Sequence, residues 1–518
     1  MQQHTNRYTH FYTVLLCLIA VGMPNLNILM SIGSILLFVL WLIYPGPVKG
    51  WNSLRKNKGA LMLIGLYLIH IVWLWNTDDY FYAWKDLRIK LPILIFGLVL
   101  GSVTLSRKQM KFTFLALATG VWIASFTGYY LYFTSVNPDL DYRSLVPGIS
   151  HIRLSLMMVM VVATVIYYWR EIEISWRIAA GVTVANILVF FNLIQSATGI
   201  IILLTLFVCI SLIFARRQYG SRALGWTACV FALLIFFFGV SSYYYYQKQF
   251  TSDEILTDLP ATTALGNTYS HYTEAGYVEN GTYVFNNICE GELMAAWNER
   301  SDLKVSYDPK LDEPVIGALI RYLSSKHLTK DRQGVMALSA ADIEWIEAGY
   351  PSVIYVEKSG LALRYHTMMF GIHQYAISGN ASGISFLQRM VYWQAAIGLI
   401  RRHPVVGIGT GDVKKAFYDI YEEEHSNLEP QYRNRAHNQF LTFFVSFGVA
   451  GFLLFIAVLL YPFIFSRPGF LFSAFLLIAF LSCLTEDTLE TQAGVTFFAF
   501  FYGLFSSSEM GTTSAGAD

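Results

Sequence analysis

The sequence predicts an all-α fold: a polytopic membrane helix bundle of about twelve spans with a large extracytoplasmic helical insertion. Of its 518 residues, 55% are hydrophobic and only 14% are charged, whereas about 25% of the residues in a soluble protein are charged. Uncharged apolar runs recur along the chain, and one long polar stretch interrupts them. The net charge is only +1, so we expect no nucleic-acid partner.

The apolar runs define the predicted spans by their length. The first run has no clear small-residue cleavage site and is soon followed by another, so we interpret it as a retained helix and not as a signal peptide. The predicted spans lie near residues 10–24, 28–44, 59–75, 91–105, 112–133, 151–169, 178–194, 198–214, 223–246, 438–465, 469–484 and 491–507.

Basic residues indicate the orientation of these spans. With the N-terminus in the cytoplasm, the connections that follow even-numbered spans are rich in Lys and Arg, as the positive-inside rule requires. Segment 76–90 is an exception, because it lies outside and carries Lys85, Arg88 and Lys90. This orientation places both termini in the cytoplasm and the long polar stretch outside.

Four parts follow from this organisation. Residues 1–246 form the N-terminal membrane helices, about nine spans, and residues 438–508 form the C-terminal membrane helices, about three. Between them, residues 247–437 form a large outer helical domain that carries part of the site, and residues 509–518 form a cytoplasmic tail. Within the outer domain, EGELMAAWNERS, PVIGALIRYLSSK and SAADIEWIEAG read as short helices. Ser339 with Asp342 resembles a capping box, and Gly349 a helix stop.

Charged and imidazole side chains gather at the outer ends of the predicted spans, where such groups are costly and usually face a cavity. They are His151 and Arg153 at the start of the sixth span, Arg389 in an amphipathic helix late in the polar stretch, Arg433, Arg435 and His437 before the tenth span, and Glu486, Asp487 and Glu490 between the last two spans. This convergence predicts a polar cavity that faces outward.

The residue types indicate the chemistry of this cavity. Arginine is a planar, permanently charged group suited to phosphate, and histidine accepts a proton near neutral pH. Arginines with one histidine at a membrane mouth suit a lipid-linked phosphate or pyrophosphate and a hydroxyl that must be activated. The acidic turn would orient the histidine, hold an arginine or bind sugar hydroxyls.

Structural interpretations remain open for the same residues. Arg433 and Arg435 would serve equally as interfacial anchors. His437 would serve as a helix N-terminal residue bonded to a loop, and His151 with Arg153 as a structural pair. The acidic residues would then form only a solvated turn.

The segment GIGTGD, residues 407–412, fails as a dinucleotide fingerprint, because Asp412 occupies the place of the third glycine and no strand precedes it. A turn is the main interpretation, although successive backbone N–H groups can hold an anion. The sequence contains no zinc-ligand spacing, serine nucleophile elbow or Walker loop. We therefore expect neither a metal nor a cofactor.

Two segments, RMVYWQAAIGLIRRHPVVGIGTGD and RAHNQFLTFFVSFGVAGFLLF, resemble the O-antigen ligase and polymerase superfamily. The shared pattern is Arg-x-x-x-Trp at Arg389 and Trp393, Pro-x-x-Gly-x-Gly from Pro404, a His-Asn pair at His437 and Asn438, and Gly-x-x-Gly from Gly448. In addition, SHIRLSLMM and LTEDTLETQAGVTFFAFF look like the branch found in Bacteroides-like bacteria.

The resemblance implies a metal-independent, inverting glycosyltransferase of the membrane GT-C type, most like an O-antigen ligase, in the bacterial inner membrane with its active site facing the periplasm. The donor would be a glycan on undecaprenyl pyrophosphate, and the acceptor a sugar hydroxyl of lipid A–core. His437 would activate that hydroxyl as general base, and Arg389 would bind the pyrophosphate and stabilise it as a leaving group. Further pyrophosphate contacts would come from Arg435 and Arg153, and support for the site or the acceptor from Asn438, Asp412, His151, Glu486, Asp487 and Glu490.

One position departs from the family pattern. The family often has a Ser-Arg pair before Gly or Thr-Gly at the outer junction of two spans, and here Ala197 stands between Ser196 and Thr198. The loss of one charge-assisted phosphate contact costs about 1.5–3 kcal/mol. Either Arg153 or Arg435 substitutes, or the enzyme is weakened or altered.

Alternative functions share these residues. An O-antigen polymerase would use another lipid-linked repeat as acceptor, and a protein O-glycosylating relative would use a Ser or Thr hydroxyl. A transporter of lipid-linked sugars would need charges along a transbilayer path or inverted repeats. The predicted charges gather at one end, which favours an enzyme.

Overall fold

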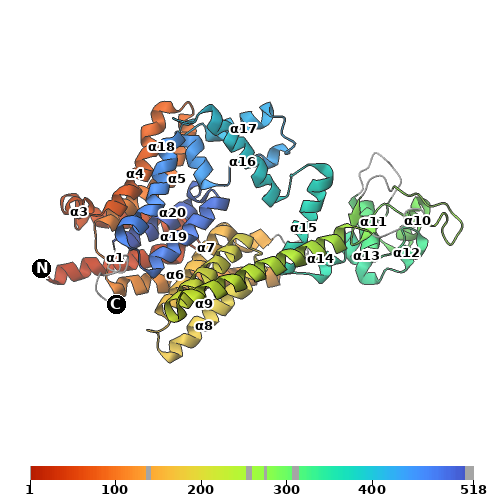
Figure 1. Ribbon diagram of the computed structural model, residues 1–518, viewed down its shortest axis with the longest axis horizontal. Coiled ribbons are helices and arrows are strands. Elements are labelled where there is room, and N and C mark those ends of the chain that lie inside the picture. The colour runs from red at the N-terminus through yellow and green to blue at the C-terminus, as the bar shows by residue number, and fades with distance from the viewer. Residues whose placement is uncertain (1, 136–141, 253–258, 273–276, 306–313, 508–518) are drawn as a thin grey trace. The chain divides into compact units, whose positions relative to one another are not determined.

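The computed structural model describes residues 2–135, 142–252, 259–272, 277–305 and 314–507 (Figure 1). These residues are almost entirely helical, with one two-stranded hairpin, which confirms the all-α prediction. The chain divides into two compact units. The first unit comprises Met1–Ile210 and Ala381–Asp518, and the second comprises Ser211–Asn380.

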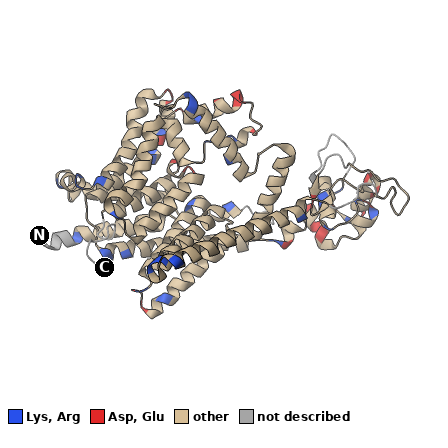
Figure 2. Ribbon diagram, viewed as in Figure 1, with Lys and Arg blue, Asp and Glu red and all other residues tan. Residues whose placement is uncertain are grey.

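The helices of the first unit carry few charged residues along their length (Figure 2). From the N-terminal segment they are α1 (Gln2–Gly22), α2 (Asn27–Ile43), α3 (Pro47–Leu54), α4 (Lys58–Val72), α5 (Tyr80–Gly101), α6 (Arg107–Thr134), α7 (His151–Tyr168), α8 (Ile174–Leu193) and the start of α9 (Ala197–Phe250). From the C-terminal segment they are α16 (Ser385–Arg402), α17 (Val413–Glu423), α18 (Gln439–Tyr461), α19 (Phe470–Thr485) and α20 (Gln492–Ser506). Short turns are η1 (Trp73–Asn76), η2 (Tyr142–Leu145), η5 (Pro430–Tyr432), η6 (Pro462–Ser466) and η7 (Thr488–Glu490).

Six helices of the described chain are long and apolar enough to cross a membrane, or seven if the bent pair α2 and α3 forms one span. The predicted count of about twelve is therefore not confirmed. The apolar parts of α1, α19 and α20 are shorter than a full span. Residues 198–214 and 223–246, expected as two spans, both lie in the 54-residue helix α9, which is interrupted at Gly220 by a backbone φ of 82°. The recurring long apolar helices still make the chain a multi-pass membrane protein.

Helix α20 lies at the centre of the first unit. Every residue from Val495 to Phe505 is buried, as expected for a helix that is apolar on all sides. Its aromatic side chains pack against α5 and α19, for example Phe500 on Phe96 with ring centroids 5.4 Å apart. Because α20 follows the acidic turn directly, this packing fixes the position of that turn.

The segment GIGTGD, residues 407–412, and the residues just before it pack against a kink in α18. The kink lies at Gly448, where φ is 63°, and a Cβ there would lie 2.1 Å from the carbonyl oxygen of Val405. In return, the N–H groups of Ile408 and Gly409 donate to the carbonyls of Val445 and Ser446 at 2.9 Å. The segment GIGTGD is thus a packing element, and these two N–H groups are not available to hold an anion.

The second unit contains the rest of α9, the helices α10 (Glu290–Arg300), α11 (Pro314–Ser325), α12 (Arg332–Met336), α13 (Ala340–Glu347), α14 (Ile354–Glu357) and α15 (Gly360–Ser378), and the hairpin β1 (Val278–Glu279) with β2 (Thr282–Tyr283). Helices α10, α11 and α13 fall on the three segments predicted to be helical. The capping box of Ser339 with Asp342 is present, and Gly349 follows α13 with φ 89°.

The boundaries of the compact units differ from those drawn on the sequence. The predicted outer domain covers residues 247–437, whereas the second unit ends at Asn380. Helices α16 and α17 therefore belong to the same compact unit as α18 to α20. Which side of a membrane residues 247–437 face stays a prediction, and the predicted tail 509–518 lies outside the described residues.

Candidate functional site

Glu486 lies in the turn between α19 and α20 and meets side chains from three other segments. Arg389 of α16 donates from Nη2 to its Oε1. Nδ1 of His437 lies 3.5 Å from Oε2, and Nη2 of Arg153 on α7 lies 4.0 Å from the same oxygen. Burial alone would raise the pKa of Glu486, but His437, Arg153 and Arg389 outweigh it and lower the pKa to about 2. The carboxylate is therefore ionised at neutral pH.

His437 stands immediately before α18 in a left-handed backbone conformation, with φ 46°. A non-glycine residue adopts this region at a cost of about 1–2 kcal/mol. Asp487 holds the conformation, because its two carboxylate oxygens accept the N–H groups of His437 and Asn438, each at 3.1 Å. The hydroxyl of Thr442 donates to the same carboxylate at 2.6 Å.

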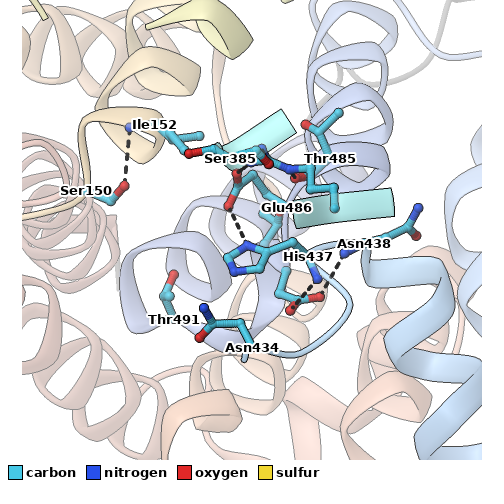
Figure 3. A network of polar contacts seen from close by, with 12 residues as sticks. Ser150, Ile152, Ser385, Asn434, His437, Asn438, Thr485, Glu486 and Thr491 are labelled. Atoms are coloured by element: carbon cyan, nitrogen blue, oxygen red, sulfur yellow. Dashed lines mark hydrogen bonds and ion pairs between the residues drawn. The ribbon is translucent and has the colours of Figure 1, made fainter. Parts of the chain in front are cut away.

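The imidazole of His437 has one occupied face and one open edge. Its ring stacks on Tyr392 of α16 with centroids 5.6 Å apart, and Nδ1 faces Glu486 (Figure 3). Among the described residues, Nε2 makes no hydrogen bond. The side chain is 36% exposed, whereas that of Glu486 is 7% exposed. Nε2 is therefore the atom that a substrate can reach, with an ionised carboxylate behind the ring.

Asn438 caps α18 and so fixes the residue before it. Its Oδ1 accepts the N–H groups of Phe440 and Leu441 at 3.0 and 3.2 Å, as expected of an N-cap residue. Its Nδ2 donates to the carbonyl of Leu484 at 3.0 Å. Both polar ends of the amide are thus engaged, which makes Asn438 a positioning residue that ties α18 to the end of α19.

Arg389 is anchored by the backbone on both sides of its ion pair. Nε donates to the carbonyl of Thr485 and Nη1 to that of Ser385, each at 2.9 Å. These contacts aim the planar guanidinium at Glu486. The side chain remains 20% exposed, so one edge is accessible to a ligand.

Arg153 lies deeper in the same cluster, and its side chain is only 5% exposed. Nε donates to the hydroxyl of Thr491 at 3.2 Å, and Nη2 donates to the carbonyl of Asp487 at 3.0 Å. Nη1 is buried and has no hydrogen-bond partner among the described residues. A buried arginine nitrogen without a partner is costly, so it marks a place where an anionic oxygen would be stabilised.

A second ionic cluster adjoins the first through η7. Glu490 accepts from Arg435 at 2.8 Å and from Lys90 of α5 at 2.9 Å, and Lys90 also contacts Asp86 one turn earlier. Gln439 donates to the other oxygen of Glu490 at 3.2 Å. Burial would raise the pKa of Glu490, but Lys90 and Arg435 lower it well below its ordinary value. Burial would lower the pKa of Arg435, but Glu490 and Asp487 raise it.

Three further predicted or candidate residues of the first unit make other contacts. The carboxylate of Asp412 accepts the N–H groups of Asp78 and Asp79 at 2.9 and 3.1 Å, so it holds the loop before α5. His151 contacts Tyr142 edge to face, with ring centroids 5.5 Å apart. Arg433 pairs with Glu422 on α17, and its interpretation as a membrane anchor stays a prediction.

Lys90, Asp86 and Tyr392 take part in the site, but the sequence analysis did not assign them to it. Lys90 carried a signal, because segment 76–90 broke the positive-inside alternation. The structure accounts for one of the three basic residues of this segment, since Lys90 is 2% exposed and paired with acidic groups, whereas Lys85 and Arg88 are exposed. The sequence did not mark Tyr392 as a site residue, because an aromatic side chain on an amphipathic helix is commonly part of a hydrophobic core.

The arrangement combines three chemical elements. It offers an exposed imidazole nitrogen backed by a carboxylate, two guanidiniums on either side of that carboxylate, and a third paired with Glu490. Such a set suits proton removal from a hydroxyl beside a bound phosphate or pyrophosphate. Among the described residues, no group of three or more His, Cys, Asp and Glu side chains is placed to hold a metal ion.

Comparison with known proteins agrees with this chemistry. Residues 345–456 match a family model described as O-antigen ligase. The matched region contains Arg389, Arg435 and His437 but ends before the acidic turn with Glu486. No curated protein sequence matches the chain.

Proposed function

We propose that this member of the O-antigen ligase superfamily is a metal-independent, inverting membrane glycosyltransferase, which transfers a glycan from undecaprenyl pyrophosphate to a hydroxyl of lipid A–core. One observation carries the proposal: the open Nε2 of His437 lies on a ring whose Nδ1 is 3.5 Å from Glu486, a carboxylate that also faces two arginines. The proposed general base and the arginines that would bind the pyrophosphate thus lie in one cluster. We place it at the periplasmic face of the bacterial inner membrane, with both termini in the cytoplasm.

His437 is the general base in this mechanism. The ionised Glu486 favours a proton on Nδ1, which leaves Nε2 free to accept the proton of the acceptor hydroxyl. The hydroxyl oxygen then forms a bond to the anomeric carbon of the donor sugar. The bond between that carbon and the pyrophosphate oxygen breaks from the opposite face, so the configuration inverts.

Arginines stabilise the charge that develops on the leaving pyrophosphate. Arg389 offers a partly exposed guanidinium, and Arg153 offers the buried, unpaired Nη1. Donors aimed at a developing charge in a dry site contribute strongly to catalysis, since they need no reorganisation. Arg435 adds positive charge beside them, balanced by Glu490.

Arg153 takes the place of the arginine that the family pattern puts at Ala197. The hydroxyls of Ser155 on α7 and Ser196 before α9 lie 2.7 Å apart, so the first turns of the two helices adjoin. An arginine from either helix would serve the same region. On this proposal Ala197 does not weaken the enzyme.

Two related functions would use the same donor site. A polymerase or a protein O-glycosylating enzyme of this superfamily differs only in the acceptor. The ionisable groups gather beside the first turns of α18 and α20, with Lys90 reaching them from α5, and this supports an enzyme over a transporter of lipid-linked sugars.

The test uses purified full-length protein in detergent with undecaprenyl-pyrophosphate glycan, lipid A–core and EDTA. Transfer to lipid A–core is the expected result. His437→Ala should abolish transfer and retain donor binding, whereas His403→Ala, at an exposed histidine after α16, should be active. Donor binding without transfer by the unaltered protein would favour a different acceptor. An active His437→Ala enzyme would overturn the proposed base.

A further inference from the structure

A cavity of about 330 Å³ lies at the end of the first unit opposite His437. Helix α18 begins beside His437 and ends at Tyr461 on the cavity wall, and α20 begins after Thr491 and ends at Ser506 on the same wall. Helix α18 has 23 residues and α20 has 15, which correspond to lengths of about 34 Å and about 22 Å. The cavity and the His437 cluster thus lie at opposite ends of these two helices.

The polar part of the cavity is suited to an anion. Lys56 and Lys58 line it together with Ser102, Thr104 and Ser506, and the hydroxyl of Ser102 also donates to the carbonyl of Leu98. No Asp or Glu is among its lining residues. Both lysines are exposed, and within the described part of the chain neither ammonium makes an ion pair. Two unpaired ammonium groups beside several hydroxyls match the charge and hydrogen-bonding capacity of a phosphate.

Part of the cavity wall is apolar. Tyr461, Phe472 and Phe505 line it, and these residues belong to helices that form the apolar core of the first unit. A free inorganic phosphate would gain nothing from that wall, because it has no apolar part. A phospholipid presents a phosphate next to a glycerol and acyl chains, and basic pockets between transmembrane helices on the cytoplasmic side are known sites for such headgroups.

We propose that this cavity binds the headgroup phosphate of an anionic phospholipid, held by Lys56 and Lys58. The acyl chains lie along the aromatic wall toward the bilayer core. The positive-inside alternation places these lysines on the cytoplasmic side, so the ligand comes from the inner leaflet. The site is separate from the glycan-transfer site, and the inference does not depend on the proposed function.

The experiment measures thermal unfolding of full-length protein in a neutral detergent during titration with dioleoylphosphatidylglycerol, dioleoylphosphatidylcholine or inorganic phosphate. A ligand that binds only the folded state raises Tm as its concentration exceeds Kd. Phosphatidylglycerol should raise the Tm of the unaltered protein, and the other two ligands should not. Lys56→Gln/Lys58→Gln should need at least about tenfold more phosphatidylglycerol, because each lysine contributes to the attraction.

Two matched variants complete the design. Lys49→Gln/Arg55→Gln removes two nearby exposed charges that do not line the cavity, and it should respond like the unaltered protein. Lys56→Arg/Lys58→Arg should also retain the response, which separates loss of charge from misfolding. Equal responses of all variants would overturn the proposal. So would equal responses to phosphatidylcholine, and protection by inorganic phosphate would replace the lipid with a soluble anion.

Discussion

Lys90 and Glu490 are 400 positions apart in the chain, yet Nζ of one lies 2.9 Å from Oε2 of the other. Both side chains are almost fully buried, at 2% and 6% exposure. The pair joins α5 to the turn before α20 and holds the carboxylate that in turn holds Arg435. The proposed donor site therefore depends on a lysine that we do not expect to touch substrate.

Replacement of Lys90 should destabilise the protein. Lys90→Met leaves Asp86 and Glu490 buried without their shared cation, and breaking a buried ion pair from one side costs about 3–5 kcal/mol. We expect a clear fall in Tm in detergent. Lys85→Met, at an exposed position of the same helix, is the control and should change Tm little. Similar falls in Tm in both variants would show that the ionic contacts of Lys90 do not stabilise the protein.

Glu486→Gln should reduce glycan transfer through its effect on His437. The neutral amide no longer favours a proton on Nδ1, so the population with a free Nε2 falls. We expect kcat to fall by about tenfold or more while the KM for the acceptor changes little. Glu423→Gln, at an exposed carboxylate that pairs with Arg402, should retain activity. An unchanged kcat in Glu486→Gln would remove the carboxylate from the mechanism.

Acid should destabilise the protein through the same residue. The pKa of Glu486 is lowered in the folded state to about 2. Its contribution to stability is therefore present above the ordinary glutamate value and is lost as pH falls toward 2. Between pH 6 and pH 3, Tm should fall further in the unaltered protein than in Glu486→Gln. Parallel curves for the two proteins would show that the carboxylate makes no such contribution.

Arg153→Gln should weaken donor binding by about ten- to a hundredfold, because it removes a charge-assisted phosphate contact. Ala197→Arg alone should have little effect, since Arg153 already supplies a guanidinium. Combined with Arg153→Gln, Ala197→Arg should recover part of the binding, because the two helix starts adjoin. Binding of a labelled undecaprenyl-pyrophosphate glycan measures all three. Full affinity in Arg153→Gln would assign the pyrophosphate to other residues.

Residue type predicted much of the cluster, because buried or interfacial charges are rare and informative. The structure brings Arg153, Arg389, His437 and Glu486 together from four segments, as their shared position at span ends indicated. Asp412 was predicted to support the site, but the structure shows it in another role. Its carboxylate caps the loop before α5, and a sequence does not tell a loop cap from a ligand.

Helix lengths and boundaries were harder to predict than the charges. A loop was predicted between residues 198–214 and 223–246, and the structure has a shorter break there, at Gly220 with φ 82°, between two helical segments of α9. Residues 381–437 were assigned to the outer domain because they lie between the ninth and tenth predicted spans. They belong to the first compact unit through buried positions of α16 and α17 such as Tyr392 and Phe417, and span positions alone do not reveal this packing.

The two ionic clusters together are electrically balanced. Four basic residues, Arg153, Arg389, Arg435 and Lys90, meet four acidic residues, Asp86, Glu486, Asp487 and Glu490, so the charges sum to zero. Cellular phosphate and nucleotides therefore meet no excess of positive charge that would retain them. On the proposed function, a pyrophosphate would share these cationic groups with Glu486 and Glu490, so lipid and sugar contacts would have to add to its affinity. The carboxylates would then disfavour small anions that lack such contacts, in addition to orienting the imidazole.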